Sequence, residues 1–154
     1  MRNILKLISV VMVSVLAAGV FAGCRGESRE PERVVELLDN DSIMERYFNA
    51  VEDFDHVEYE QIYFNYGRTD GLGPHEYRFR GIVYLTDEEA QRIWDAYEWE
   101  EADPEFEFDK VDTSAIGDGP WYSCREFESD NYSIIVPYYT VFDGQNLVFD
   151  IHQI

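Results

Sequence analysis

The stretch YSIIVPYYTVFDGQNLVFDI, residues 132–151, contains two runs of strand-forming residues on either side of Asp143 and Gly144. An Asp-Gly pair between two such runs is a strong signal for a β-hairpin. Pro137 lies inside the first run and has no backbone N–H to donate, so we expect an edge strand or a β-bulge at this position. The stretch therefore predicts an antiparallel hairpin in the C-terminal third of the chain.

Two more strand-like stretches precede this hairpin. They are EFEFDKV, residues 105–111, and WYSCREF, residues 121–127. In the first of them, acidic residues alternate with Phe106 and Phe108, as on a strand that has one face in water. We therefore expect four strands in this third of the chain, all in one antiparallel sheet.

An earlier pair of strands is predicted in QIYFNYG, residues 61–67, and EYRFRGIVYL, residues 76–85, which are joined by a turn-rich loop. A hairpin with Tyr66 opposite His75 places Ile62 beside Phe79 on the buried face. It also places Phe64 beside Tyr77, and it lets Tyr63 meet Arg78 on the outer face.

The same register turns the carboxylates of Glu58 and Glu60 toward the core. We therefore expect a bulge before Gln61, or a strand that begins only near that residue.

Two segments have a helical pattern. The first is residues 31–54, with Pro31 suited to a helix start and the capping-box pair Ser42 and Glu45 favouring one bent helix or two consecutive ones. Its apolar stripe is formed by Met44, Tyr47, Phe48 and Val51. The second helix follows Thr86, which is predicted to cap it together with Glu89, and its apolar face consists of Ala90, Ile93, Trp94 and Tyr97. Spacing favours a core role for this face, and the alternative is a ligand platform formed by Trp94 and Tyr97.

The order of these elements is helix, two strands, helix and four strands. It predicts an α+β domain over residues 33–154, with a single antiparallel sheet of five to six strands and one or two helices packed on one face.

The N-terminal residues have the layout of an export signal. Arg2 and Lys6 accompany an apolar run up to Val20, and Ala22 and Gly23 stand directly before Cys24. This segment resembles the signal peptide and lipobox of bacterial lipoproteins, although Phe21 occupies the position where the lipobox usually has leucine.

The resemblance implies removal of residues 1–23 and attachment of a lipid to Cys24, with residues 24–32 forming the lipidated end and a short tether. It places the protein at the cell membrane with its domain outside the cytoplasm. Two alternatives stay open, namely an uncleaved membrane helix over residues 4–23 and secretion after cleavage near Ala22.

The chain is strongly acidic, with 12 basic and 32 acidic residues and a net charge of −20. Loss of the signal peptide removes two basic residues and no acidic residue, which makes the net charge −22. Such a chain repels phosphates, so we expect no nucleic-acid partner. A basic protein or peptide is the partner that this charge favours.

No motif for a cofactor, a metal or a catalytic site is found, so we assign no catalytic residue, no metal ligand and no cofactor. The isolated histidines His56, His75 and His152 have no zinc-ligand spacing, and Cys124 is expected to be a small buried hydrophobe. The acidic cluster has three interpretations: a solvated face, a face for a cationic partner, or a metal site. Its members are Glu98, Glu100, Glu101, Asp103, Glu105, Glu107, Asp109 and Asp112.

Four aromatic residues of the predicted strands are the candidate binding residues: Trp121, Tyr122, Tyr138 and Tyr139. If helices cover only one face of the sheet, some of these rings lie on the other face and can bind a peptide, a glycan or a protein. The alternative is packing against neighbouring elements.

We predict a membrane-anchored binding or modulating protein of the cell envelope that does no chemistry. The alternative function is a small envelope hydrolase with carboxylates and His152 or Asp150 in a concavity of the sheet.

Overall fold

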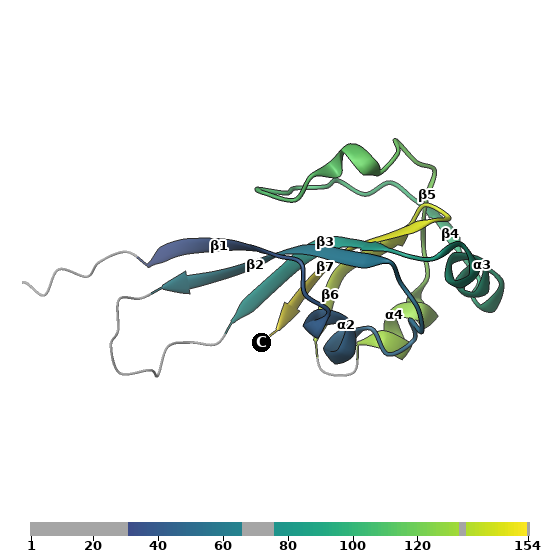
Figure 1. Cartoon of the computed structure of the whole chain (residues 1–154), viewed down its shortest axis with the longest axis horizontal. Coiled ribbons are helices and arrows are strands. Elements are labelled where there is room, and N and C mark those ends of the chain that lie inside the picture. Colours follow the sequence, from purple (N-terminus) through teal and green to yellow (C-terminus); the bar gives the residue numbers. More distant parts are fainter. Residues whose placement is uncertain (1–30, 66–75, 133–134, 154) are drawn as a thin grey trace, which may run out of the picture. The chain divides into compact units, whose positions relative to one another are not determined.

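One antiparallel sheet of seven strands organises the domain in the computed structural model, which describes residues 31–65, 76–132 and 135–153 (Figure 1). The strand order is β1-β2-β3-β7-β6-β5-β4. The strands are β1 (Glu32–Leu38), β2 (His56–Asn65), β3 (Tyr77–Tyr84), β4 (Glu100–Ala102), β5 (Trp121–Ser123), β6 (Val136–Phe142) and β7 (Asn146–Gln153). The α+β class and the single antiparallel sheet are confirmed, with seven strands in place of the predicted five to six. Residues 1–30, which include the predicted signal peptide and Cys24, lie outside the described residues.

The hairpin β6–β7 forms as predicted. Gly144 adopts a φ of 95°, and the Asp143 carboxylate accepts hydrogen bonds from the backbone N–H groups of Gln145 (2.8 Å) and Asn146 (2.6 Å). The register shifts between Pro137 and Tyr139, which is the expected bulge. Local turn chemistry therefore determines this part of the fold.

The first predicted helix is wrong over its N-terminal part. Residues 32–38 form β1, which pairs along its whole length with β2, from Glu32 opposite Asn65 to Leu38 opposite Tyr59. Adjacent valines favour an extended backbone, and the pairing with β2 reinforces that preference. Only α2 (Ser42–Tyr47) is helical, and no side chain caps it, so the expected capping box does not form. Met44, Tyr47 and Phe48 of its predicted apolar stripe are nevertheless buried in the core, and Val51 is partly buried against it.

The predicted register of β2 and β3 is wrong by one residue. Gln61 pairs with Phe79, and Ile62 pairs with Arg78, so Ile62 and Phe79 lie on opposite faces. Tyr63 contacts the ring of Tyr77 and not Arg78. The pair Tyr66 and His75 lies outside the described residues.

Glu60 is buried without any bulge, which corrects the expectation that the strand begins near Gln61. Strand β2 already begins at His56, and Glu60 is 0% exposed. The fold accepts this carboxylate because Arg80 stands directly opposite it on β3.

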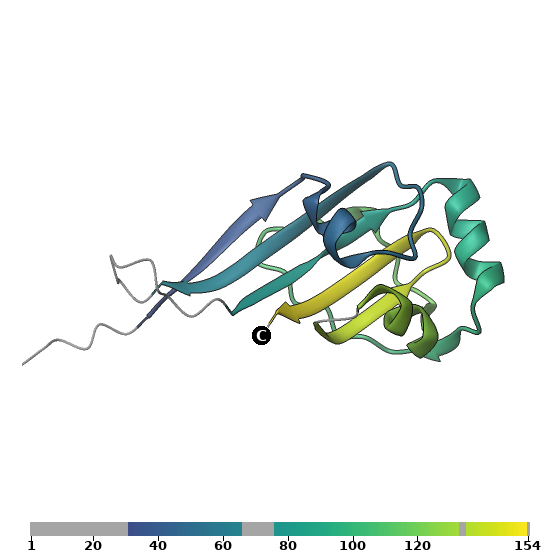
Figure 2. The same ribbon diagram turned by 90° about the horizontal axis from the view of Figure 1, so that it is seen from below.

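Helices α2 and α4 (Arg125–Asn131) cover one face of the sheet, and α3 (Asp87–Ala96) lies across one end of the strands (Figures 1 and 2). Side chains of all three helices join the larger core cluster, among them Met44, Ile93 and Phe127. Helix α4 corrects the prediction that residues 121–127 are all strand. Three residues form β5, and the chain then turns into a helix whose buried side is Phe127 and Asn131.

Helix α3 is confirmed in position and in its cap, since Thr86 Oγ1 accepts from the Glu89 N–H at 3.3 Å. Glu89 does not return this bond. Its carboxylate accepts from the Glu52 N–H at 2.7 Å and from Arg92. Trp94 is 38% exposed and contacts Tyr122 edge-on.

The second face of the sheet is covered by residues 103–120, an irregular segment that contains the short 3₁₀ helix η1 (Thr113–Ala115) (Figure 1). The prediction of a strand over residues 105–111 is therefore wrong. Phe106, Phe108 and Val111 of this segment pack with Trp121 and Val148 of the sheet in a second core cluster. No helix among the described residues has the length and apolarity needed to cross a membrane.

Candidate functional site

A buried ion pair holds the 103–120 segment against the sheet. Glu60 and Arg80, which are 0% and 3% exposed, meet at 2.6 Å. The Glu60 carboxylate also accepts from the backbone N–H groups of Lys110 and Val111, the latter at 3.0 Å. The carboxylate therefore satisfies two backbone donors of a segment that has no strand partner of its own.

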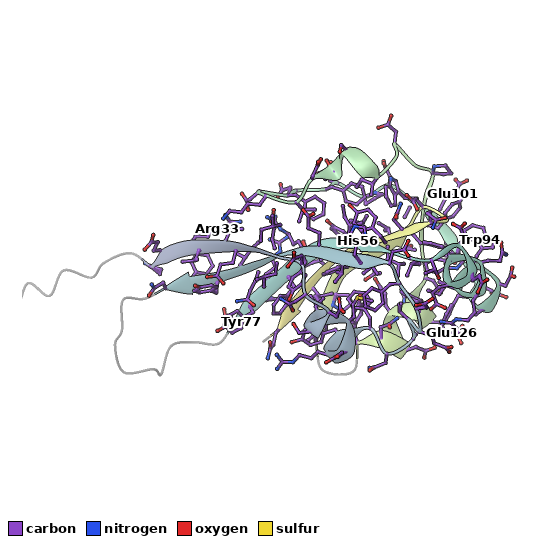
Figure 3. All side chains as sticks on the ribbon, viewed as in Figure 1. Arg33, His56, Tyr77, Trp94, Glu101 and Glu126 are labelled. Carbon is purple, nitrogen blue, oxygen red and sulfur yellow. The ribbon has the colours of Figure 1, made fainter. Side chains whose placement is uncertain are left out.

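Asp109 extends this pair to the first strand. Its carboxylate accepts from Arg80 at 2.7 Å and from Arg33 of β1 at 2.6 Å, and Arg33 rises from β1 toward the segment (Figure 3). The Arg33 guanidinium holds the pKa of the Asp109 carboxyl below its usual value. Lys110 Nζ donates a hydrogen bond to the backbone carbonyl of Val35 at 2.7 Å. The segment is thus tied to β1, β2 and β3 together.

A second cluster of polar and aromatic side chains lies beside this one on the same face. Arg78 donates two hydrogen bonds to the carboxylate of Asp150, which is 1% exposed. The Arg78 guanidinium also lies 5.0 Å from the ring centroid of Tyr138, and the His152 ring stacks on that tyrosine at 6.0 Å. Asp150 is therefore the acidic member of a structural ion pair with Arg78, and the His152 side chain packs on the Tyr138 ring.

Internal contacts occupy most of the basic side chains. Among the described residues there are seven arginines and lysines, and five of them contact a carboxylate or a backbone carbonyl: Arg33, Arg78, Arg80, Arg92 and Lys110. Five of the 29 described acidic side chains form ion pairs. The described surface is therefore dominated by carboxylates without a basic partner.

A groove of ≈ 750 Å³ is lined by residues of strands β4 to β6, by the start of α4 and by the beginning of the 103–120 segment. Its lining carboxylates come from both sides and are Glu98, Glu100, Asp103, Glu126 and Glu128. Arg125 is the one basic side chain among the lining residues, and the rings of Tyr138 and Tyr139 contribute to the wall. The groove is open, acidic and partly aromatic.

Glu128 is the most constrained of these carboxylates. It accepts a hydrogen bond from the Thr140 backbone N–H at 2.9 Å. Burial raises the pKa of this carboxyl, and the Thr140 N–H opposes that effect. Glu126, two residues earlier on the same helix, is exposed and projects from α4 (Figure 3).

The four predicted binding aromatics do not share one environment. Trp121 is 6% exposed and packs edge-on against Phe106 at 4.9 Å, so it belongs to the core. Tyr122 faces Trp94 on the opposite side of the sheet. Tyr138 and Tyr139 both line the groove, and Tyr138 is the most exposed of the large apolar side chains described, at 61%.

Tyr139 has an unusual hydroxyl. The ring lies 5.9 Å from that of Phe106, and the hydroxyl oxygen is buried without a hydrogen-bond partner among the described residues. Burial raises the pKa of this hydroxyl to about 12.

The remaining candidates are placed as follows. His56 stacks on Tyr84 at 4.0 Å, and His75 lies outside the described residues. Cys124 is buried, as expected, at the start of α4. The acidic cluster of residues 98–112 is exposed, and three of its members line the groove. Within the described part of the chain, no group of three or more His, Cys, Asp or Glu side chains is arranged to hold a metal ion.

Sequence reasoning misses Glu126 and Glu128, because it predicts a strand over residues 121–127 and no helix after it. This short helix has no apolar stripe that would signal it, because Phe127 is apolar but its buried neighbour one turn later, Asn131, is polar. The groove therefore joins two predicted aromatics to acidic residues of a helix that was not expected.

No protein-family model, no curated protein and no solved structure matches this chain.

Proposed function

We propose that this chain is an exported, lipid-anchored binding protein of the cell envelope whose acidic domain captures a cationic protein or peptide. The observation that supports the proposal is the internal pairing of basic side chains, which leaves the described surface with a large excess of unpaired carboxylates. A surface of one sign attracts oppositely charged partners and accelerates their association. Inhibition of a cationic hydrolase or toxin is one specific form of this function.

The proposed anchor is the lipid on Cys24. The acidic domain is repelled by anionic headgroups, so the lipid, and not the protein surface, holds the chain at the membrane. A Cys24→Ser variant is expected to move from the membrane fraction to the soluble fraction after cell breakage. Retention of this variant in the membrane would instead favour an uncleaved helix over residues 4–23.

Capture of envelope proteins tests the binding function. Residues 28–154 are immobilised, exposed to an envelope extract, and washed with increasing salt, while immobilised polyglutamate serves as a control for unspecific charge. We expect at least one basic protein that the domain retains, that polyglutamate does not retain, and that elutes at moderate salt, because salt screens interactions between exposed charges. An empty capture, even after mild crosslinking, would contradict the proposal.

The groove also supports a second candidate, the small envelope hydrolase. It brings Glu128, whose pKa is raised by burial, into the same groove as Glu126 and Glu100. A carboxyl whose pKa is raised by burial and that lies near other carboxylates is the pattern of a general acid. Cleavage of an envelope polymer that is abolished by Glu128→Gln, with the fold intact by circular dichroism, is the result that would establish this candidate.

A further inference from the structure

Strand β6 has a partly open edge beside the groove. The strand runs over Val136–Phe142, but β5 pairs with Phe142 and Val141 alone. Among the described residues, the N-terminal half of β6 therefore has a neighbouring strand on its β7 side only. On the open side, the Thr140 N–H donates a hydrogen bond to the Glu128 carboxylate. This carboxylate takes the place of the backbone carbonyl that a further strand would provide. Open edges of this kind are common binding sites for extended peptides.

Two apolar side chains at this edge are unusually exposed. Val136 and Tyr138 are 51% and 61% exposed, and they are the two most exposed of the large apolar side chains described. The Arg78 guanidinium already lies over the Tyr138 ring, 5.0 Å from its centroid, and most of the Tyr138 side chain is still exposed. Aromatic rings attract cations through the negative charge of their faces, so this ring can contact a second basic group.

The charge of the groove selects the sign of the occupant. Five carboxylates and one arginine line it, and Glu98, Glu100 and Glu126 are exposed and form no ion pair with a described residue. Two features limit backbone pairing with an incoming strand. Pro137 has no N–H to donate, and the bulge between Pro137 and Tyr139 breaks the ladder. Contacts to side chains must therefore supply most of the affinity.

We propose that this groove, next to the open half of β6, binds a short extended segment of the partner protein in which basic and apolar residues alternate. The basic side chains face Glu98, Glu100 and Glu126, and an apolar side chain packs on Tyr138. The inference rests on the proposed function, since it names the surface and the type of segment by which a cationic partner is recognised.

The test uses a peptide of about seven residues with alternating arginine and valine, matched to the length of β6. Its affinity for the full chain, purified in a nonionic detergent, is measured by fluorescence anisotropy. The groove variant is Glu98→Gln/Glu100→Gln/Glu126→Gln. The matched control is Glu45→Gln/Glu88→Gln/Asp95→Asn, which removes the same charge from exposed residues of α2 and α3.

We expect the groove variant to weaken binding about tenfold and the control to weaken it less than about threefold. Tyr138→Ala should also weaken binding, about fivefold, and Tyr138→Phe should restore it because the ring is kept. Circular dichroism checks that each variant is folded.

Two results overturn the inference in different ways. Equal weakening by the groove and control variants would show that the peptide responds to overall charge. This result would contradict the groove as the binding site, but it would not contradict the proposed function. Absence of any binding by the unaltered protein, to this peptide and to a polylysine of similar length, would contradict the proposed function as well.

Discussion

Replacement of Arg80 by methionine tests whether the buried ion pair holds the 103–120 segment in place. Methionine keeps an apolar stem like that of arginine but has no guanidinium, so Glu60, which is 0% exposed, stays buried without its basic partner. Removal of one member of a buried ion pair typically costs about 3–5 kcal/mol of stability. The two backbone N–H donors that still reach Glu60 reduce this loss, so we expect a decrease of about 3 kcal/mol in the free energy of unfolding.

Urea denaturation followed by tryptophan fluorescence measures this loss. Trp121 lies beneath the segment, against Phe106, and reports on its release, while Trp94 and Trp99 report on the other side of the sheet. The double variant Glu60→Gln/Arg80→Met is expected to be more stable than Arg80→Met. The glutamine amide oxygen still accepts from the Lys110 and Val111 N–H groups, and no buried charge is left unpaired.

An exposed arginine provides the control. Arg125→Met changes the same residue type at the surface and should alter stability by less than about 0.5 kcal/mol. A loss below about 1 kcal/mol in Arg80→Met, or a double variant that is less stable than the single one, would refute the reasoning about this ion pair.

Three further predictions concern single positions. In Gly81→Ala the added Cβ would overlap the Glu58 carbonyl oxygen and Tyr59, whose Cα is 2.8 Å away, so we expect a loss of about 1–3 kcal/mol in a urea titration. Tyr139→Phe removes a buried hydroxyl that has no described partner, and thermal denaturation should show equal or higher stability, with a gain of up to about 1 kcal/mol. Burial alone would raise the pKa of Glu89, but the hydrogen bonds from Arg92 and the Glu52 N–H hold it below its ordinary value of 4.5. The stability that this carboxylate provides is complete above pH 4.5 and is lost as the pH falls through the lower folded pKa, so Glu89→Gln should cost more at about pH 6 than at about pH 3.5.

The sequence predicts the parts of the fold that depend on local chemistry. The β6–β7 hairpin follows from Asp143 and Gly144, and helix α3 follows from its Thr86 cap and its apolar face. In both cases the residues that set the conformation lie within a few positions of one another.

The errors arise where pairing with a distant strand decides the structure. Residues 32–38 form a strand because β2 pairs with them. In the observed register of β2 and β3, Glu60 and Arg80 stand opposite each other, and both contact the 103–120 segment. Sequence analysis expects a buried carboxylate to be unfavourable, and it cannot detect this pair. The groups that stabilise Glu60, namely the Arg80 guanidinium and the Lys110 N–H, lie 20 and 50 residues away in the sequence.

The candidate site was predicted only in part for the same reason. Tyr138 and Tyr139 were identified from their strand, whereas Glu126 and Glu128 required the helix that follows β5. Trp121, from the same set of predictions, is covered by the 103–120 segment, of which sequence analysis predicts residues 105–111 to be a strand of the sheet.

The salt dependence of binding tests the central claim most directly. The affinity of the alternating arginine and valine peptide for the unaltered protein is measured from about 50 mM to about 500 mM NaCl at neutral pH, a range in which the screening length falls from well above 10 Å to below it. Recognition by exposed carboxylates predicts that the Kd rises at least about tenfold over this range. A Kd that does not change with salt, or no binding at the lowest salt concentration, would contradict the account of this chain as an acidic module for a cationic partner.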